Sequence, residues 1–270
     1  MDAFPHSEIT DITMSTSSVT NRIRSKYRRL CADRLFRRPF PISSVTPLIS
    51  FTFDDFPETA LSVGGSILRE AGALGTYFVS LSLAGKDDAS GRMYQLDDLV
   101  KLQEQGHELG CHTFGHCDSS ETESKVFVDS VISNQSALES VIPGAVFRSF
   151  SFPKSAPRAQ TKRAVGKRFE CCRGGGQTFN AGIADLNYLR SFFLEQARGD
   201  LSAVKTVIDQ NRAQNGWLIF STHDVCSSPS PYGCTPEFFG AAVRYAAESG
   251  ATILPVIRAW ERLRKTTDTK

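Results

Sequence analysis

The sequence predicts an α/β fold in which a parallel sheet curls into a barrel within a single domain. From residue 47 onward, short apolar segments alternate with longer segments whose apolar residues recur at helical spacing. Such alternation favours parallel strands joined by crossover helices. Seven or so units follow one another without a linker or an internal repeat, which indicates one barrel rather than two domains.

The alternation begins with LISFTFD (48–54), a short apolar run that predicts a buried strand. Apolar spacing predicts a helix over 58–72, and the glycine at its end is a common helix terminator. GTYFVS (75–80) predicts the second strand. A second helix over 95–106 also ends at a glycine, and HELGCH (107–112) predicts a short third strand.

The middle of the chain continues the pattern. Apolar spacing predicts a helix over 123–142, and AVFRSFSF (145–152) predicts the fourth strand. Pro153 stops this strand because proline lacks the N–H that a sheet ladder needs. A helix over 158–168 and the strand FECCRG (169–174) follow.

The last third contains an extended segment and two further strands. Residues 186–195 read as extended, and 200–214 as a helix. GWLIFSTHD (216–224) predicts a strand, 236–250 a helix, and ATILPVI (251–257) a final strand. We therefore expect an N-terminal tail and basic helix over 1–46, the catalytic domain over 47–264 and a C-terminal tail over 265–270.

Composition narrows the class of protein. The chain has 270 residues, of which 40% are hydrophobic and 22% charged, as in ordinary globular proteins. Its apolar runs are too short to span a bilayer, and the first thirty residues show no secretory signal. Seven irregularly spaced cysteines favour a reducing, cytoplasmic location over a disulfide framework; a Cys226–Cys234 pair is the less favoured alternative.

The N-terminal segment is strongly basic. Residues 1–20 read as a poorly ordered tail. Residues 21–38 hold seven Arg, one Lys and one Asp, with apolar residues at helical spacing between them. We favour a helix docked on the domain with a solvated basic face; the alternative is peripheral contact with an anionic membrane. No nucleic-acid-binding motif accompanies the patch, so nucleic acid is not expected as a partner.

Polar residues gather where predicted strands end. In barrels of this kind, the C-terminal ends of the strands converge on one site. The residues at or near these ends are Asp54, Asp55, His112, Pro153, Arg173 and His223.

Two histidines and the aspartate pair suggest a metal centre. A four-residue separation places His112 and His116 on one side of a helical turn, although this spacing alone is a weak signal. With Asp55 they form a His₂Asp set, which leaves a coordination position open for water, as in catalytic zinc sites. Asp54 is then free to move protons. We expect the neighbouring Cys111 and Cys117 to be small apolar fillers rather than ligands.

These motifs resemble the polysaccharide deacetylase family, also called the NodB-homology domain or carbohydrate esterase family 4. The family's Thr-Phe-Asp-Asp-Gly-Pro stands here as TFDDFP (52–57), and its His-Ser/Thr-x-x-His as HTFGH (112–116). Its late motif, an apolar strand ending in histidine, is WLIFSTHDV, which contains His223. The resemblance covers roughly residues 47–260 and implies a distorted (β/α)7-type barrel of the NodB-homology kind.

The resemblance also implies roles for these residues. Asp55, His112 and His116 would hold a divalent metal, usually Zn²⁺. Asp54 would be the general base that deprotonates the attacking water, and His223 the general acid that protonates the leaving amine. A carboxylate beside a cation stays ionised, and a histidine titrates near neutral pH, so both residue types suit these tasks.

The chain departs from the family pattern in its first and third motifs. Phe56 replaces the usual glycine. The third motif, usually Arg-x-Pro-Tyr, is FSFPKS (150–155), closer to a Phe-x-Tyr-Pro variant. Here the backbone N–H of Lys154, after Pro153, would help to stabilise the oxyanion.

The remaining assignments are less specific. The arginine that orients the base would be Arg173, with Arg148 as the alternative. Asp185 is a weak candidate for the family's fourth-motif aspartate. Three aromatic residues are expected on loops above the site, where they could stack on sugar rings. They are Phe56, Phe114 and Tyr232.

We therefore expect a metal-dependent hydrolase that removes an N-acetyl group from an amino sugar. The expected partner is an acetylated glycan or a glycolipid. Three alternatives remain: a C–N hydrolase of a small non-sugar amide, a sugar O-acetyl esterase, and an inactive carbohydrate-binding homologue. The intact aspartate and histidine motifs argue against the last.

Overall fold

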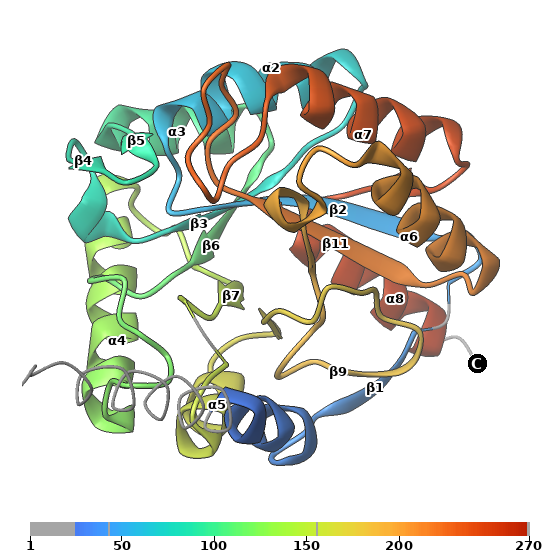
Figure 1. The fold of residues 1–270 in the computed structure, drawn as a ribbon. Coiled ribbons are helices and arrows are strands. Elements are labelled where there is room, and N and C mark those ends of the chain that lie inside the picture. Colours follow the sequence, from blue (N-terminus) through green and yellow to red (C-terminus); the bar gives the residue numbers. More distant parts are fainter. Residues whose placement is uncertain (1–24, 43, 155, 269–270) are drawn as a thin grey trace, which may run out of the picture.

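The centre of the molecule is a curled, all-parallel sheet (Figure 1). The computed structural model describes residues 25–42, 44–154 and 156–268. In spatial order the strands of the sheet are β10 (Phe192–Phe193), β11 (Trp217–Thr222), β2 (Leu48–Asp54), β3 (Thr76–Val79), β6 (Glu108–Cys111), β7 (Ser149–Ser151) and β8 (Cys171–Arg173). The curled parallel sheet of about seven strands predicted from the sequence is confirmed.

Strand β2 lies at the middle of the sheet. All seven of its residues are buried, because parallel strands in α/β folds are covered on both faces. It pairs with β11 over six residues and with β3 over three. A short strand, β12 (Thr252–Ile253), also pairs with the first two residues of β2.

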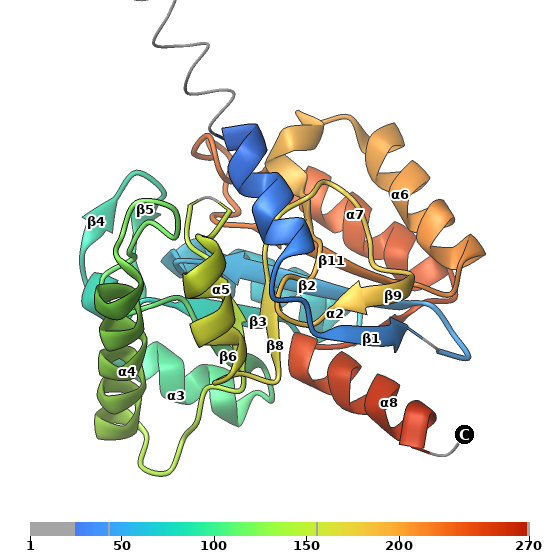
Figure 2. The same ribbon diagram turned by 90° about the horizontal axis from the view of Figure 1, so that it is seen from below.

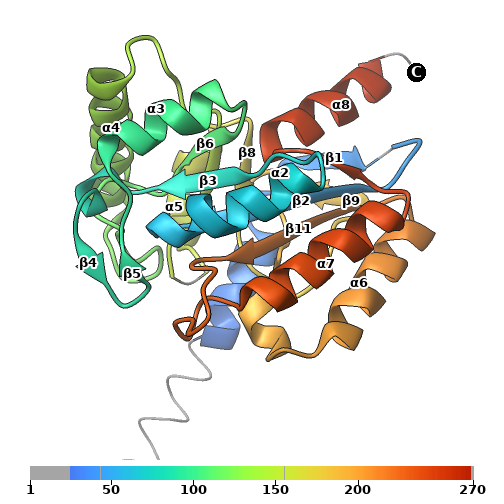
Figure 3. The same ribbon diagram turned by 90° about the horizontal axis from the view of Figure 1, so that it is seen from above.

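Helices cover the outer face of the sheet (Figures 1 and 3). In chain order they are a π-helical turn (Ala60–Gly65) that continues into α2 (Ser66–Glu70), then α3 (Leu96–Glu104), α4 (Ser124–Val141), α5 (Ala159–Gly166), α6 (Leu201–Ala213) and α7 (Pro236–Glu248). Shorter elements are the hairpin β4 (Asp87–Asp88) and β5 (Gly91–Arg92) and the 3₁₀ turns Leu81–Leu83 and Leu194–Ala197.

Two glycines let the first helical segment lie directly on the sheet. A Cβ at Gly64 would come within 2.8 Å of the Phe53 ring, and one at Gly65 within 2.9 Å of the Tyr77 hydroxyl. The glycine pair inside the predicted helix 58–72 therefore serves close packing, which outweighs its low helix propensity.

The sheet does not close directly between β8 and β10. One parallel bridge joins Arg173 to Leu189, and a second sheet forms from β1 (Pro39–Ile42) and β9 (Gly182–Asp185), which pair antiparallel. Strand β1 belongs to the segment expected to be tail and basic helix, so contacts cross the expected boundary at residue 47. The boundary itself stays a prediction.

The basic N-terminal segment forms a helix over residues 25–34 that lies beside α5 (Figures 1 and 2). Ala32 is fully buried. The ammonium of Lys162, on α5, donates to the carbonyls of Ala32 and Leu35 at 2.5 and 2.9 Å and pairs with Asp185. The segment is therefore docked on the barrel, while the tail expected over residues 1–20 lies outside the described residues.

The C-terminal segment differs from the prediction. The strand expected over 251–257 is wrong beyond Ile253, because helix α8 (Val256–Asp268) begins within it. Its apolar residues Val256, Trp260 and Leu263 are buried, at the i, i+4, i+7 spacing of a helix. Helix α8 also runs across the expected boundary at residue 264.

Two further findings concern the cysteines and the helices. All seven cysteines are free, so the structure contains no Cys226–Cys234 disulfide. Among the described residues, the helices are too short or too polar to cross a bilayer.

Candidate functional site

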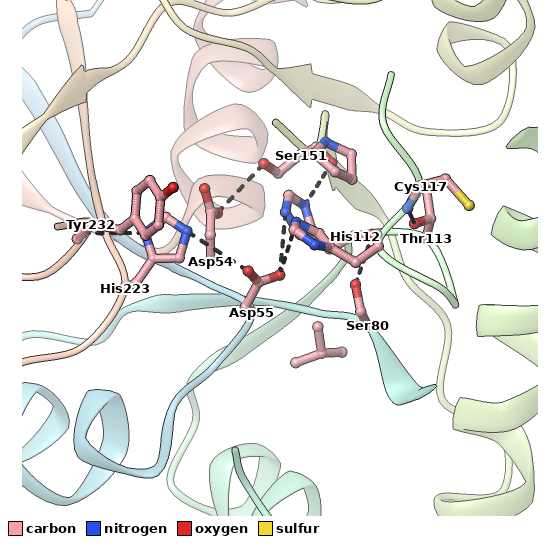
Figure 4. A network of polar contacts seen from close by, with 12 residues as sticks. Asp54, Asp55, Ser80, His112, Thr113, Cys117, Ser151, His223 and Tyr232 are labelled. Atoms are coloured by element: carbon pink, nitrogen blue, oxygen red, sulfur yellow. Dashed lines mark hydrogen bonds and ion pairs between the residues drawn. The ribbon is translucent and has the colours of Figure 1, made fainter. Parts of the chain in front are cut away.

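The C-terminal ends of the strands bring the predicted site residues together. Asp54 ends β2 and Arg173 ends β8, while His112 and His223 directly follow β6 and β11. Because these strands are parallel, their carboxyl ends share one edge of the sheet. Figure 4 shows Asp54, Asp55, His112 and His223 gathered around one space.

Asp55 faces two imidazoles. Its Oδ1 lies 3.3 Å from Nε2 of His116 and 3.7 Å from Nε2 of His112. The ligand atoms of the three residues all lie within 4.8 Å of one another. This spacing is compatible with one shared metal ion.

The two histidines are not on a helix, so the expectation of a helical turn is wrong. Residues 112–116 form a loop in which Thr113 and His116 have φ angles of 65° and 48°. A left-handed conformation is unusual for a β-branched residue and concentrates at functional sites. The Thr113 hydroxyl accepts the N–H of Cys117 at 3.0 Å, which helps to hold the loop.

The protonation of both histidines suits metal binding. Nδ1–H of His112 donates to the carbonyl of Ser151 at 2.8 Å, so the lone pair of Nε2 faces Asp55. Burial lowers the pKa of His112 to about 3. Burial, and then the charge of Lys154, lowers the pKa of His116 to about 4. Neutral imidazole is the form that ligates metals.

Asp54 is held ionised by a buried arginine. Nη2 of Arg173 lies 2.6 Å from Asp54 Oδ1, and the Ser221 hydroxyl donates to Oδ2 at 3.2 Å. Burial is the largest influence and opposes ionisation, but Arg173 and the nearby histidines outweigh it and hold the pKa of Asp54 at about 2.

Arg173 is itself fixed in place. Its guanidinium donates to the Ser191 hydroxyl at 3.1 Å and lies over the Phe78 ring, 5.3 Å from the centroid. Such a rigid fork fits the orientation of a carboxylate.

Asp55 is the opposite case. Burial and the adjacent Asp54 charge raise the pKa of Asp55 to about 8. Its Oδ1 is buried and finds no hydrogen-bond partner among the described residues. A divalent cation would satisfy this oxygen and offset the repulsion between the two carboxylates. One carboxylate and two neutral imidazoles fit Zn²⁺ with one position left open.

Phe56 occupies its position at a conformational cost. Its φ is 63°, next to Asp55 at 60°, in a region that glycine adopts freely. The ring is fully buried and stacks on Tyr94 with centroids 4.7 Å apart. Phe56 is therefore a core residue, and the expectation that it stacks on sugars from a loop above the site is wrong.

His223 lies on the other side of Asp55. Its Nε2 is 3.8 Å from Asp55 Oδ2, and its Nδ1–H donates to the carbonyl of Tyr232 at 3.3 Å. The side chain is 16% exposed, so it can be reached from solvent. Burial lowers its pKa, although the Asp54 charge opposes this. A histidine with a lowered pKa is a stronger acid once protonated.

Pro153 and Lys154 border the site beyond β7. The Pro153 carbonyl accepts the hydroxyl of Ser119 at 2.9 Å, which ties this loop to the loop that carries His116. Lys154 has a φ of 63°. Its positive charge opposes the rise in the pKa of Asp55 and contributes to the lowered pKa of His116.

Two alternative residues lie elsewhere. Arg148 precedes β7 and pairs with Glu170 at 2.7 Å and with Glu261 at 2.5 Å. Asp185 pairs with Lys162 beneath the N-terminal helix. Neither contacts Asp54 or the site histidines, so Arg173 alone is placed to orient Asp54.

Near the site, two aromatic residues are exposed, whereas Cys111 is buried. Phe114 and Tyr232 are 37% and 50% exposed at the rim, where they could contact a substrate. Cys111 is fully buried, and its sulfur accepts the amide of Asn134 at 3.3 Å. Neither Cys111 nor Cys117 belongs to the metal-ligand cluster of the described residues.

The sequence reasoning missed Glu195. Glu195 lies in the 3₁₀ turn that follows β10, and β10 pairs with β11, the strand that precedes His223. Burial, with a smaller contribution from the Asp54 charge, raises the pKa of Glu195 to about 7. Its position just past a short strand was the available signal.

Part of the chain is similar to a known protein family. Residues 43–169 match the family model described as polysaccharide deacetylase. A chitooligosaccharide deacetylase of Azorhizobium caulinodans is 31% identical over 120 residues, which are 44% of this chain and 53% of that protein. The chain thus spans about half the length of this curated relative.

Solved structures share the fold. The Xyl-CE4 domain of a multidomain xylanase from the hindgut metagenome of Trinervitermes trinervoides has a TM-score of 0.55 at 18% identity, covering 80% of this chain and 91% of that one. A family 4 acetyl xylan esterase from Clostridium thermocellum, in complex with a cobalt ion, has a TM-score of 0.56 at 18% identity, covering 79% and 90%. At these identities the likeness concerns the fold alone.

The matched residues 43–169 include the aspartate pair and the two metal-facing histidines, while His223 lies beyond them. Over residues 43–169, which are less than half of the chain, this protein is similar to the polysaccharide deacetylase family.

Proposed function

We propose that this protein is a metal-dependent hydrolase that removes an N-acetyl group from an amino sugar in an oligosaccharide, a polysaccharide or a lipid-linked glycan. The observation that carries the proposal is the pair of adjacent carboxylates. Asp54 is locked against buried Arg173, and Asp55 presents an unpartnered, buried oxygen to two neutral imidazoles. The family match and the curated relative support this class of substrate.

The first half of the proposed reaction belongs to Asp54. Its carboxylate, kept ionised and oriented by Arg173, takes the proton of the water that attacks the acetyl carbonyl carbon. A divalent cation held by Asp55, His112 and His116 would polarise the acetyl carbonyl and make the attacking water more acidic.

The second half belongs to His223 and Lys154. Protonated Nε2 of His223 faces the site and would give its proton to the leaving nitrogen as the C–N bond breaks. The products are acetate and the free amine. The backbone N–H of Lys154 would stabilise the negative charge that develops on the carbonyl oxygen.

The test is acetate release by the purified protein, supplied with Zn²⁺, from chitooligosaccharides, acetylated xylan and small non-sugar amides. The proposal expects release from chitooligosaccharides and none from Asp54→Asn. Release from xylan alone would identify an O-acetyl esterase, and release from small amides alone a non-sugar C–N hydrolase. No release from any of the three, with metal bound, would identify an inactive homologue.

We also propose Zn²⁺ as the native cation, because two imidazoles and one carboxylate form a donor set typical of catalytic zinc. Elemental analysis of protein purified without added metal tests this. We expect one zinc per chain and little or none in His112→Ala. A different divalent metal, retained at one per chain, would overturn the choice of zinc and leave the site assignment intact.

A further inference from the structure

The N-terminal helix over residues 25–34 leaves one face uncovered. Tyr27, Leu30 and Arg34 are separated by three and four residues, so they share one side of the helix. Tyr27 is 66% exposed and Leu30 47% exposed. Arg34 lies on this side, Lys26 beside it and Arg29 at the flank of the helix; all three are exposed, and none forms an ion pair with the described part of the chain.

The opposite side of the helix holds it to the barrel. Arg28 and Ala32, four residues apart, point inward: Arg28 pairs with Glu121 at 2.7 Å, and Ala32 is fully buried. Asp33 pairs with Arg190 at 2.8 Å. Docking therefore explains the inward side only. On the outward side the Tyr27 hydroxyl interacts with Cys31 of the same helix, but the side chains of Tyr27 and Leu30 stay exposed.

The exposed surface extends past the end of the helix. Leu35 and Phe36 are 44% and 42% exposed. Four large apolar side chains within ten consecutive residues are therefore 42–66% exposed and interleaved with basic residues, although the Phe36 ring also contacts the Arg163 guanidinium, 5.2 Å from its centroid. We call residues 26–37 the basic–apolar face. Such a helix, with a charged side chain next to each apolar one, suits the interface of a lipid bilayer better than a dry protein interface.

The face adjoins the rim of the candidate site. Arg28 donates to the hydroxyl of Ser120 at 2.9 Å, in the loop that follows His116. In the same loop, Ser119 bonds to Pro153, which borders the site. In Figure 2 the helix lies along α5, so a surface that receives the helix would lie close to the loops of the site.

We propose that the basic–apolar face docks on an anionic lipid surface. The argument is charge complementarity combined with exposed apolar area: residues 21–38 carry seven Arg and one Lys against one Asp. Cations near an anionic leaflet are attracted to it, while Tyr27 and Leu30 enter the headgroup region. The inference does not rest on the proposed function, because vesicle binding is measured without turnover.

The first experiment is cosedimentation of the full chain with vesicles. One population contains about one-third phosphatidylglycerol in phosphatidylcholine, and the other contains phosphatidylcholine alone. We expect binding to the anionic vesicles at low salt, a marked loss at high salt, and little binding to the neutral vesicles. A wild-type chain that stays in the supernatant with both would overturn the proposal.

The second experiment assigns binding to the face. Lys26→Glu, Arg29→Glu and Arg34→Glu together change the net charge from +2 to −4, since each reversal subtracts two. The matched control reverses Arg198, Arg212 and Arg244, which are exposed on the α6–α7 side and give the same net charge. We expect the first variant to lose about 100-fold or more in binding and the control to change by far less.

A third variant tests the apolar part. Leu30→Ser should weaken vesicle binding roughly ten-fold while leaving its salt dependence unchanged. Equal losses in the helix variant and the control variant would show that only net charge matters, and would overturn the proposed face. Binding of the wild type to a mixed-sequence RNA, with none to anionic vesicles, would also overturn it in favour of a nucleic-acid partner.

Discussion

At the scale of single residues, the two adjacent aspartates differ because of what surrounds them. Asp54 contacts a buried guanidinium, and its pKa is held at about 2. Among the described residues, no guanidinium or ammonium forms an ion pair with Asp55, and one of its oxygens has no hydrogen-bond partner there. The sequence alone does not distinguish the two aspartates. Their roles differ because Arg173, at the end of β8, contacts Asp54.

The first prediction separates these roles experimentally. Asp54→Asn should keep the metal and lose about 10²–10⁴-fold in kcat, because the shape stays and the base is lost. Asp55→Ala should lose metal and activity together. Metal content and kcat of both variants, measured under identical conditions, check this. An Asp54→Asn protein with wild-type turnover, or one as depleted of metal as Asp55→Ala, would contradict the assignment.

The second prediction concerns Phe56. Its ring is buried against Tyr94, so truncation to Ala should cost about 3–5 kcal/mol of unfolding free energy. Its φ of 63° strains every residue except glycine, by about 1–2 kcal/mol. Phe56→Gly should therefore be more stable than Phe56→Ala, although glycine is normally the weaker choice. Urea unfolding of the two variants decides; the reverse order would show that the turn is not strained.

The third prediction uses Glu195, whose folded pKa of about 7 lies above its ordinary 4.5. Between these values the folded state binds more protons than the unfolded state, so Glu195 makes stability fall as pH rises through this window. Glu195→Gln removes the effect. From about pH 5 to about pH 8 the variant should gain stability relative to wild type. Glu139→Gln, on the exposed side of α4, should show no such gain; parallel pH curves for Glu195→Gln and wild type would refute the argument.

At the scale of elements, the sequence predicted the strands that end at the site, but it predicted the other strands and helices only in part. Strands β2 and β11 were predicted because each is a long apolar run that ends in a polar site residue. Helix α8 was missed because ATILPVI is short and β-branched, and Pro255 was not recognised as a residue favoured at helix starts. Strand β9 was missed because its four residues show no clear apolar alternation. Its partner β1 also lies about 140 residues earlier in the sequence.

The choice between two arginines shows what sequence lacked. Arg148 and Arg173 both lie in predicted strands, and only strand direction separates them. Arg148 precedes the observed β7, on the side away from the site, whereas Arg173 ends β8. The strands predicted over 145–152 and 169–174 were longer than the observed β7 and β8, so they did not show at which strand end each arginine lies. The sequence also gives no information on the side chains that pack around Arg173.

The fourth prediction tests how the N-terminal helix is held. Lys162 is fully buried and donates to two carbonyls at the C-terminal end of that helix while pairing with Asp185. Lys162→Met would leave Asp185 buried without its cation, and should cost about 3–5 kcal/mol. Lys167→Met, which changes an exposed lysine next to the end of the same helix α5, should cost less than about 0.5 kcal/mol. Similar losses in the two variants would show that the buried pair does not anchor the segment.

At the scale of the whole molecule, one end of the barrel is packed against helix α8 and the other end holds the catalytic candidates. Helix α8 lies at the N-terminal end of the sheet, where the N–H of Ile257 donates to buried Glu108 at 2.8 Å and that of Val256 to Thr76 at 2.9 Å. The catalytic candidates occupy the other end, on loops with left-handed residues such as Asp55 and Thr113. In such barrels one face carries stability and the other carries chemistry, and the left-handed residues beside the proposed metal ligands lie on the face that carries chemistry, although Asn215 before β11 is left-handed as well.

The last prediction links the site to the stability of the whole chain. A cation that binds only the folded state stabilises it by about 2.7 kcal/mol at a hundred times its Kd. For a domain of this size, that corresponds to a rise in Tm of about 5–10 °C. Removing the metal with a chelator should lower the Tm by this amount, and added Zn²⁺ should restore it. The His112→Ala variant, which lacks one ligand, should melt at the same temperature with and without chelator. A wild-type Tm that ignores the chelator, or an equal shift in His112→Ala, would show that Asp55, His112 and His116 do not form the site that the folded chain uses to hold its metal.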